Sequence, residues 1–333
     1  MEHDRNDQHE RDWSNFTPSS KISTSHQWLV RYCPSAILQD SYGPSGRPSV
    51  LTTDHEVYGN GDYPILFRIG NGGAGYTGVV QTLCLEFIRT HGNDFRIGWV
   101  ANHSRHSHIA LLGNIVQVAL TYEPGIEEMT EREGWCRRVL KPAFWDHFIL
   151  VGPRSNPARL GGDVSYLDAL CKIASSDRDV VFHTRGDGSA TFVMEQKLWE
   201  AAGVSNASSA SFVETNPLPP YQALEHAGQS AAYKLTDRAT FLTAKADGKI
   251  PDLVVYVEGG RELLNPCSAV VNTKVPDSTA QRTAVTFAEW LGGETAQGIF
   301  EGYGRNWEQG VPLFTPARRE EFKKDDGLVG KEL

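Results

Sequence analysis

The sequence predicts a soluble α/β protein with two lobes, and three observations lead to this fold class. The chain has 333 residues, which is above the size at which one hydrophobic core usually stops growing. From Tyr63 onward, short apolar runs alternate with segments of helical spacing, which is typical of parallel strands flanked by helices. Glycine-rich or polar turns follow several of the apolar runs, at the position where open α/β sheets bind ligands.

The expected strands and helices follow one another in a regular order. The strands are expected at 64–70, 95–101, 115–124, 147–153, 179–186 and 251–260, with a short one opening 231–246. The helices are expected at 79–92, 108–114, 127–135, 165–176, 190–204, the second half of 231–246, and 283–304. Gly92 is placed to end the helix that starts near Val79. This alternation predicts a parallel sheet with helices on its faces.

Composition excludes some classes of function. The formal net charge of -9 argues against a general affinity for nucleic acid, whose backbone selects basic surfaces. The five cysteines are far apart and form no C-x-x-C, which argues against a disulfide framework or a zinc site. We expect no cofactor.

The two ends of the chain are expected to lie outside the folded body. Residues 1–61 are polar and rich in Ser, Pro and Gly, so we expect them to be disordered or loosely attached and removable without unfolding. Residues 321–333 form a charged tail. The first residues contain no apolar signal segment, and no later stretch is long and apolar enough to cross a membrane. We therefore expect a cytoplasmic protein that does not insert into membranes.

The turn that starts at Gly70 reads Gly-Asn-Gly-Gly-Ala-Gly and opens a helix. Glycines allow a backbone to approach a ligand closely, and the N–H groups of a helix start attract anions, so Asn71, Gly72 and Gly73 are candidate ligand contacts. The turn also fits G-x-G-x-x-G, but no acidic residue ends the next strand where a ribose contact would lie. A tight turn with no ligand is the alternative.

The segment 102–108 contains three histidines and reads as a polar turn. Its histidines lie at alternate positions with no nearby carboxylate, which argues against a metal site. Ser104 and Arg105 are candidate anion contacts, and a solvated loop is the alternative.

Two later turns also precede helices. In the segment 184–191, Arg185 offers a planar and permanently charged fork of donors, and Ser189 and Thr191 offer hydroxyls beside helix N–H groups. The alternative pairs Arg185 with Asp187 and uses Ser189 as a simple helix cap. In the segment 235–240, Thr236 or Asp237 caps a helix, which is compatible with a ligand role for Thr236.

Four motifs in this order and spacing resemble those of the tungstate-binding proteins of bacterial uptake systems. The motifs are VGP at 151–153, TRGDGSAT at 184–191, LTDRAT at 235–240 and LLNP at 263–266, and the resemblance extends over about 63–304. It implies a type II periplasmic-binding-protein fold, in which two crossover strands form a hinge and a tetrahedral metal oxyanion lies between the lobes. One lobe would then be 62–149 plus 254–320 and the other 150–253, hinged near Leu150 and Val254, with the segments 147–153 and 252–259 as crossovers.

The resemblance also implies roles for individual residues. Arg185 matches the family's ligand arginine, and Ser189, Thr191, Thr236 and Arg238 match polar positions around its cleft. The first turn departs from the family, because Thr77 and Gly78 are kept while earlier hydroxyl residues are replaced by glycines. Backbone N–H groups can take the place of these hydroxyls, which leaves the identity of the anion open.

Three functions remain open from the sequence. The first is a binding protein that closes on a small oxyanion such as tungstate or molybdate and does no chemistry. The second is an enzyme that has recruited the cleft, with acid–base candidates His103, His106, His183, Asp187 and Asp237. The third is a regulatory protein whose closure on its ligand is sensed by an unknown protein partner.

Overall fold

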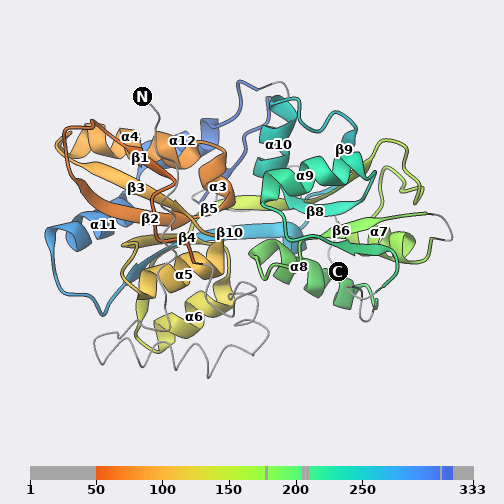
Figure 1. The fold of residues 1–333 in the computed structure, drawn as a ribbon, viewed down its shortest axis with the longest axis horizontal. Helices are drawn as coiled ribbons and strands as arrows, with labels where there is room; N and C mark the ends of the chain where they lie inside the picture. Colours follow the sequence, from red (N-terminus) through yellow and green to blue (C-terminus); the bar gives the residue numbers. More distant parts are fainter. Residues whose placement is uncertain (1–49, 177–178, 205–206, 208–209, 308–309, 318–333) are drawn as a thin grey trace, which may run out of the picture. The chain divides into compact units, whose positions relative to one another are not determined.

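The computed structural model describes residues 50–176, 179–204, 207, 210–307 and 310–317 (Figure 1). The chain forms two compact units, Met1–Ala143 with Cys267–Ala296 (unit 1) and Phe144–Pro266 with Gln297–Leu333 (unit 2). The expected N-terminal segment up to residue 49 and the expected charged tail lie outside the described residues. None of the helices in the described ranges is long and apolar enough to span a membrane.

The sheet of unit 1 has a parallel centre with antiparallel neighbours. The order is β1-β3-β2-β4-β10, in which β2 is parallel to both β3 and β4. β1 is antiparallel to β3, and β10 is antiparallel to β4. The strands are β1 Glu56–Tyr58, β2 Ile65–Asn71, β3 Arg96–Ala101, β4 Val118–Thr121 and β10 Leu264–Asn272. The carboxyl ends of β2, β3 and β4 therefore lie at one edge of the sheet.

Helices cover both faces of these strands. The helices of this unit are α3 Gly73–Tyr76, α4 Val79–His91, α5 Ser104–Leu112, α6 Pro124–Arg132 and α11 Thr279–Trp290. On one face of β2, the ring of Phe67 packs against Phe87 of α4 and Phe287 of α11. On the other face, a β-carbon at Gly70 would lie 3.2 Å from Cβ of Ser107 in α5, so this helix packs closely against the strand. Figure 1 shows α4 above and α5 below the strands of this unit.

The last part of the segment expected to be loosely attached, residues 50–61, belongs to the folded unit. It contains β1, which extends the sheet at β3, and Val50 and Tyr58 are buried. Asp54 accepts two hydrogen bonds from the guanidinium of Arg68 on β2, at 2.8 and 3.0 Å. Polar composition concealed this strand, because only one of its three residues is buried.

Unit 2 is built on the second half of β5, Cys136–Pro153, which pairs antiparallel with β8, β9 and β11. A separate parallel pair, β6 and β7, joins β8 through a parallel bridge between Phe182 and Tyr233. These strands are β6 Phe182–Thr184, β7 Val213–Thr215, β8 Lys234–Asp237, β9 Leu253–Glu258 and β11 Thr315–Pro316.

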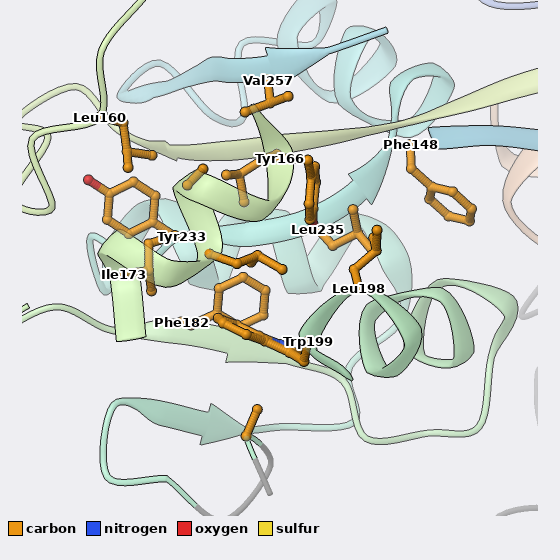
Figure 2. Close-up of a cluster of buried hydrophobic side chains, with 14 of the residues drawn as sticks. Phe148, Leu160, Tyr166, Ile173, Phe182, Leu198, Trp199, Tyr233, Leu235 and Val257 are labelled. Carbon is orange, nitrogen blue, oxygen red and sulfur yellow. The ribbon is translucent and has the colours of Figure 1, made fainter. Parts of the chain in front are cut away.

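The helices of unit 2 are α7 Tyr166–Ala174, α8 Ala190–Ala201, α9 Pro220–Gln229 and α10 Arg238–Ala246, with the 3-10 helix η3 at Arg261–Leu263. Of these, α7, α8 and η3 contribute side chains to an apolar cluster (Figure 2). α12, Glu294–Gly302, has residues in both units. Figure 2 shows Phe182, Trp199, Tyr233 and Leu235 pointing into one apolar cluster. The ends of β6 and β8 are thereby fixed beside each other.

The sheet differs from the expected one in strand direction. The sequence predicted a parallel sheet, but β1, β9, β10 and β11 pair antiparallel with their neighbours, and β8 pairs antiparallel with β5. Apolar patterning reports that a strand is buried, but it does not report the direction of its partner. The expected crossover at 252–259 contains β9, which lies within unit 2, whereas β5 and β10 have residues in both units.

Candidate functional site

The turn after β2 is held in place by the side chain of Asn71. Its Oδ1 accepts a hydrogen bond from the N–H of Gly75 at 2.7 Å, and its Nδ2 donates to the carbonyl of Leu120 at 3.0 Å. The side chain is fully buried. Asn71, predicted as a ligand contact, therefore ties this turn to β4 through both ends of its amide.

The same turn brings backbone close to the next one. A β-carbon at Gly72 would lie 3.2 Å from both Cα of His103 and the carbonyl oxygen of Asn102, so the turns after β2 and β3 touch. Gly73 is the first residue of α3, and Thr77 donates its hydroxyl to the carbonyl of Ala74 at 2.7 Å. The glycines thus supply close backbone approach, while Thr77 stabilises the end of the short helix.

The segment predicted as a polar turn after β3 is in fact the first turn of α5, and its side chains are buried. Ser104 Oγ accepts a hydrogen bond from the N–H of Tyr122 at 3.0 Å. Arg105 Nη2 donates to Glu123 Oε1 at 2.6 Å, and its side chain is only 5% exposed. Both residues bind the segment that follows β4, so the solvated-loop alternative is wrong.

The histidines of α5 lie close together. The ring centroids of His103 and His106 are 3.7 Å apart. Burial lowers the pKa of His108 to about 4, which keeps this ring neutral near pH 7. Among the described residues, no group of three or more His, Cys, Asp or Glu side chains is placed to hold a metal ion.

In unit 2, Arg185 follows β6 and is held by two partners. Its Nε donates to the carbonyl of Leu218 at 2.9 Å, and its Nη2 forms an ion pair with Asp187 Oδ2. The two side chains are 11% and 16% exposed. Gly186 and Gly188 have φ of 58° and 67°, so the turn needs residues that adopt the left-handed conformation. The pairing with Asp187 that the sequence left open is present.

The same turn forms the N-terminus of α8. Ser189 Oγ accepts a long hydrogen bond of 3.4 Å from the N–H of Phe192, and the N–H of Ser189 donates to Asp187 Oδ1 at 3.1 Å. Thr191 lies in the first helical turn and is partly exposed. Asp187 therefore joins the guanidinium of Arg185 to the start of this helix.

The turn after β8 is stabilised by carboxylates. Asp237 caps α10 by accepting from the N–H of Thr240 at 2.7 Å, and Thr236 is buried just before it. Arg238 Nη1 donates to Glu258 Oε1 at 3.3 Å, and its Nη2 lies 3.5 Å from the carbonyl of Leu313. Burial strongly raises the pKa of the nearby Asp146 carboxyl.

The structure groups the predicted residues by unit. In unit 1, the turns that carry Asn71, Gly72 and Gly73 and those that carry Ser104 and Arg105 touch each other. In unit 2, β6 and β8 are parallel neighbours, so Arg185 and Thr236 follow strands that end at the same edge.

Sequence reasoning missed two buried polar residues behind the Arg185 turn, Lys234 and Glu195, which lie beside the predicted acid–base candidate His183. Lys234 Nζ lies 3.3 Å from His183 Nδ1. Burial lowers the pKa of His183 to about 3, so its ring is neutral and accepts from the ammonium group. The available signal was a lysine between Tyr233 and Leu235, in an otherwise apolar strand.

Comparison with known proteins identifies the relatives of this chain. The family model of the PBP superfamily domain matches residues 53–294. A tungstate-binding protein from Peptoclostridium acidaminophilum is 32% identical over 179 residues, which cover 53% of this chain and 60% of that protein. A Haloferax volcanii protein assigned as an ABC transporter anion-binding protein is 33% identical over 206 residues, which cover 60% of this chain and 57% of that protein. The chain thus spans less than two thirds of the length of both relatives.

A solved structure confirms the fold class. A crystal structure described as periplasmic and metal-binding is 31% identical, has a TM-score of 0.68, and is matched over 79% of this chain and 98% of that chain. The type II periplasmic-binding-protein fold and the resemblance to tungstate-binding proteins, both predicted from the sequence, are confirmed.

The cytoplasmic location expected from the sequence is wrong. The relatives of this chain include one protein assigned to an ABC transporter and one described as periplasmic, and such substrate-binding proteins work outside the cytoplasm. The composition of the first residues was therefore a misleading indicator of location.

Proposed function

Because this chain belongs to the PBP superfamily, we propose that it is a binding protein for a small tetrahedral oxyanion such as tungstate or molybdate. The names of the two relatives, one for tungstate and one for anions, support this ligand class. By the same comparison, we propose that the bound anion is delivered to an ABC transporter.

One observation carries the proposal, namely the contact between the turns after β2 and β3 in unit 1. Gly72 approaches the backbone of His103 so closely that the start of α5 lies against a glycine turn. N–H groups at a helix start and in a glycine turn favour anions through their dipoles, and they need no hydroxyl side chain. Such a site suits a fully ionised oxyanion, which accepts hydrogen bonds and has none to donate.

Three of the acid–base candidates of the enzyme alternative, Asp187, Asp237 and His183, are engaged in structural contacts, which favours binding without chemistry. Asp187 is paired with Arg185, and Asp237 caps α10. The lowered pKa of His183 makes it a weak base near pH 7.

Isothermal titration of the full chain tests the proposal. We expect saturable binding of tungstate or molybdate that is tighter than binding of sulfate, phosphate or acetate. Gly72→Ala should weaken it, because the added β-carbon would push the two turns apart. The matched control is Gly125→Ala, whose β-carbon would meet no atom within 4 Å. Absence of binding for every oxyanion, or turnover of a small phosphate ester, would reject the proposal.

A further inference from the structure

Lys234 is a buried cation that the site described so far does not use. Its residue is 2% exposed, and its ammonium nitrogen lies 3.3 Å from Nδ1 of His183. Removing an ammonium group from water is costly unless other charges compensate it. A lysine at this position therefore requires a reason beyond packing.

The alternation of β8 places Lys234 behind the turn that carries the candidate ligand groups. Figure 2 shows Tyr233 and Leu235 pointing into the apolar cluster. Because successive side chains of a strand point to opposite faces, Lys234 and Thr236 share the other face. Thr236 is two residues, or about 7 Å, further toward the carboxyl end of the strand, where the Arg185 turn also lies.

The Arg185 turn carries no net charge of its own. The guanidinium of Arg185 is matched by the carboxylate of Asp187. Burial lowers the pKa of Lys234, whereas the nearby Glu195, Asp187 and Asp237 oppose that shift. Burial raises the pKa of Glu195, whereas the charges of Lys234 and Arg185 lower it.

We propose that Lys234 is a specificity-determining residue, whose buried ammonium supplies the second positive charge that lets the Arg185 turn prefer a dianion over a monoanion of the same shape. This inference rests on the proposed function. The residue acts through its field rather than by contact, so its effect should depend on the charge of the ligand. Tungstate and perrhenate are suitable probes, because both are tetrahedral and differ mainly in charge.

The test compares Lys234→Met with Lys249→Met, which removes the same charge from an exposed position of unit 2. Coulomb energy is proportional to the ligand charge, so a loss of about threefold for perrhenate should accompany a loss of about tenfold for tungstate. Lys249→Met should change neither affinity appreciably. Circular dichroism checks the fold, because Lys234→Met leaves the buried Glu195 without an opposite charge beside it.

A pH titration of the unaltered protein provides a second readout. Tungstate affinity should fall as the pH rises from 7 toward 10, because the ammonium of Lys234 loses its proton earlier than that of an ordinary lysine. This fall should be absent in Lys234→Met and persist in Glu195→Gln. The charged or titratable groups around Lys234 are His183, His226, Glu195, Arg185, Asp187 and Asp237.

The outcomes separate the two proposals. If the unaltered chain binds no oxyanion, the proposed function fails. If it binds tungstate, but Lys234→Met weakens the binding of tungstate and perrhenate by the same factor or leaves both affinities unchanged, the inference about Lys234 is overturned while the proposed function stands. A flat pH profile of tungstate affinity would also overturn it, even if Lys234→Met did not fold.

Discussion

Replacing Arg185 by alanine should weaken both oxyanion binding and the fold of unit 2. The side chain is mostly buried and holds two parts of the unit together, the carbonyl of Leu218 before α9 and the carboxylate of Asp187 before α8. Folding would be nearly unaffected by this change only if the arginine faced an open cleft, which these contacts do not allow.

The contacts give the size of the effect. A charged donor bonded to a carbonyl contributes about 1.5–3 kcal/mol when buried, and a largely exposed ion pair about 0.2–1 kcal/mol. Arg185 and Asp187 are partly screened at 11% and 16% exposure, so we expect a total loss of about 2–3 kcal/mol in the free energy of unfolding. For a unit of this size, that loss lowers Tm by roughly 4–12 °C. Loss of a charge-assisted bond to the anion should weaken its binding at least about tenfold.

The assay combines scanning calorimetry with tungstate titration for Arg185→Ala, Arg185→Lys, Asp187→Ala and the double variant. The lysine should restore little affinity, since a point charge does not reproduce the planar fork. The double variant should be less damaged than the sum of the single ones, because each single change leaves the other charge unpaired. If Arg185→Ala lowers Tm but leaves tungstate affinity unchanged, Arg185 is a structural residue, and the hypothesis that this turn contacts the anion is refuted.

Three further predictions concern unit 1. A chain truncated to start at residue 62 should have a free energy of unfolding about 3–6 kcal/mol lower than one that starts at residue 50, because it lacks β1 and two buried side chains. An equal urea midpoint for the two chains would contradict this. Gly75→Ala should lower the free energy of unfolding of the unit by about 1–3 kcal/mol, because the β-carbon would lie 2.1 Å from the ring of Trp99. Gly125→Ala is the control, and equal melting temperatures of the two variants would refute the reasoning. The buried His108 has a folded pKa of about 4, below its unfolded value of 6.5, so stability should fall by roughly 3 kcal/mol as the pH drops from 6.5 to 4. His108→Leu should make the free energy of unfolding, measured by urea titration, less dependent on pH over this range. An unchanged pH dependence would contradict this prediction.

The sequence by itself determined the local features of this protein. The helix over 79–91 ends before Gly92, whose φ of 140° few other residues adopt, and the apolar runs mark β2, β3 and β6. The turns with Asn71, Arg185 and Thr236 were located because each follows such a run. Motif order also indicated the family, since spacing between motifs is a property of the chain alone.

Tertiary structure decided what the polar groups of those turns do. Asn71 donates a hydrogen bond to Leu120, Arg105 to Glu123, and Arg185 to Leu218. These partners lie between 18 and 49 residues away in the chain. Local patterning cannot report such partners, because they depend on which strands become neighbours and in which direction they run. Lys234 shows the same limit, since its position in an apolar strand is visible in the sequence, but its contact with His183 exists only because β6 and β8 lie side by side.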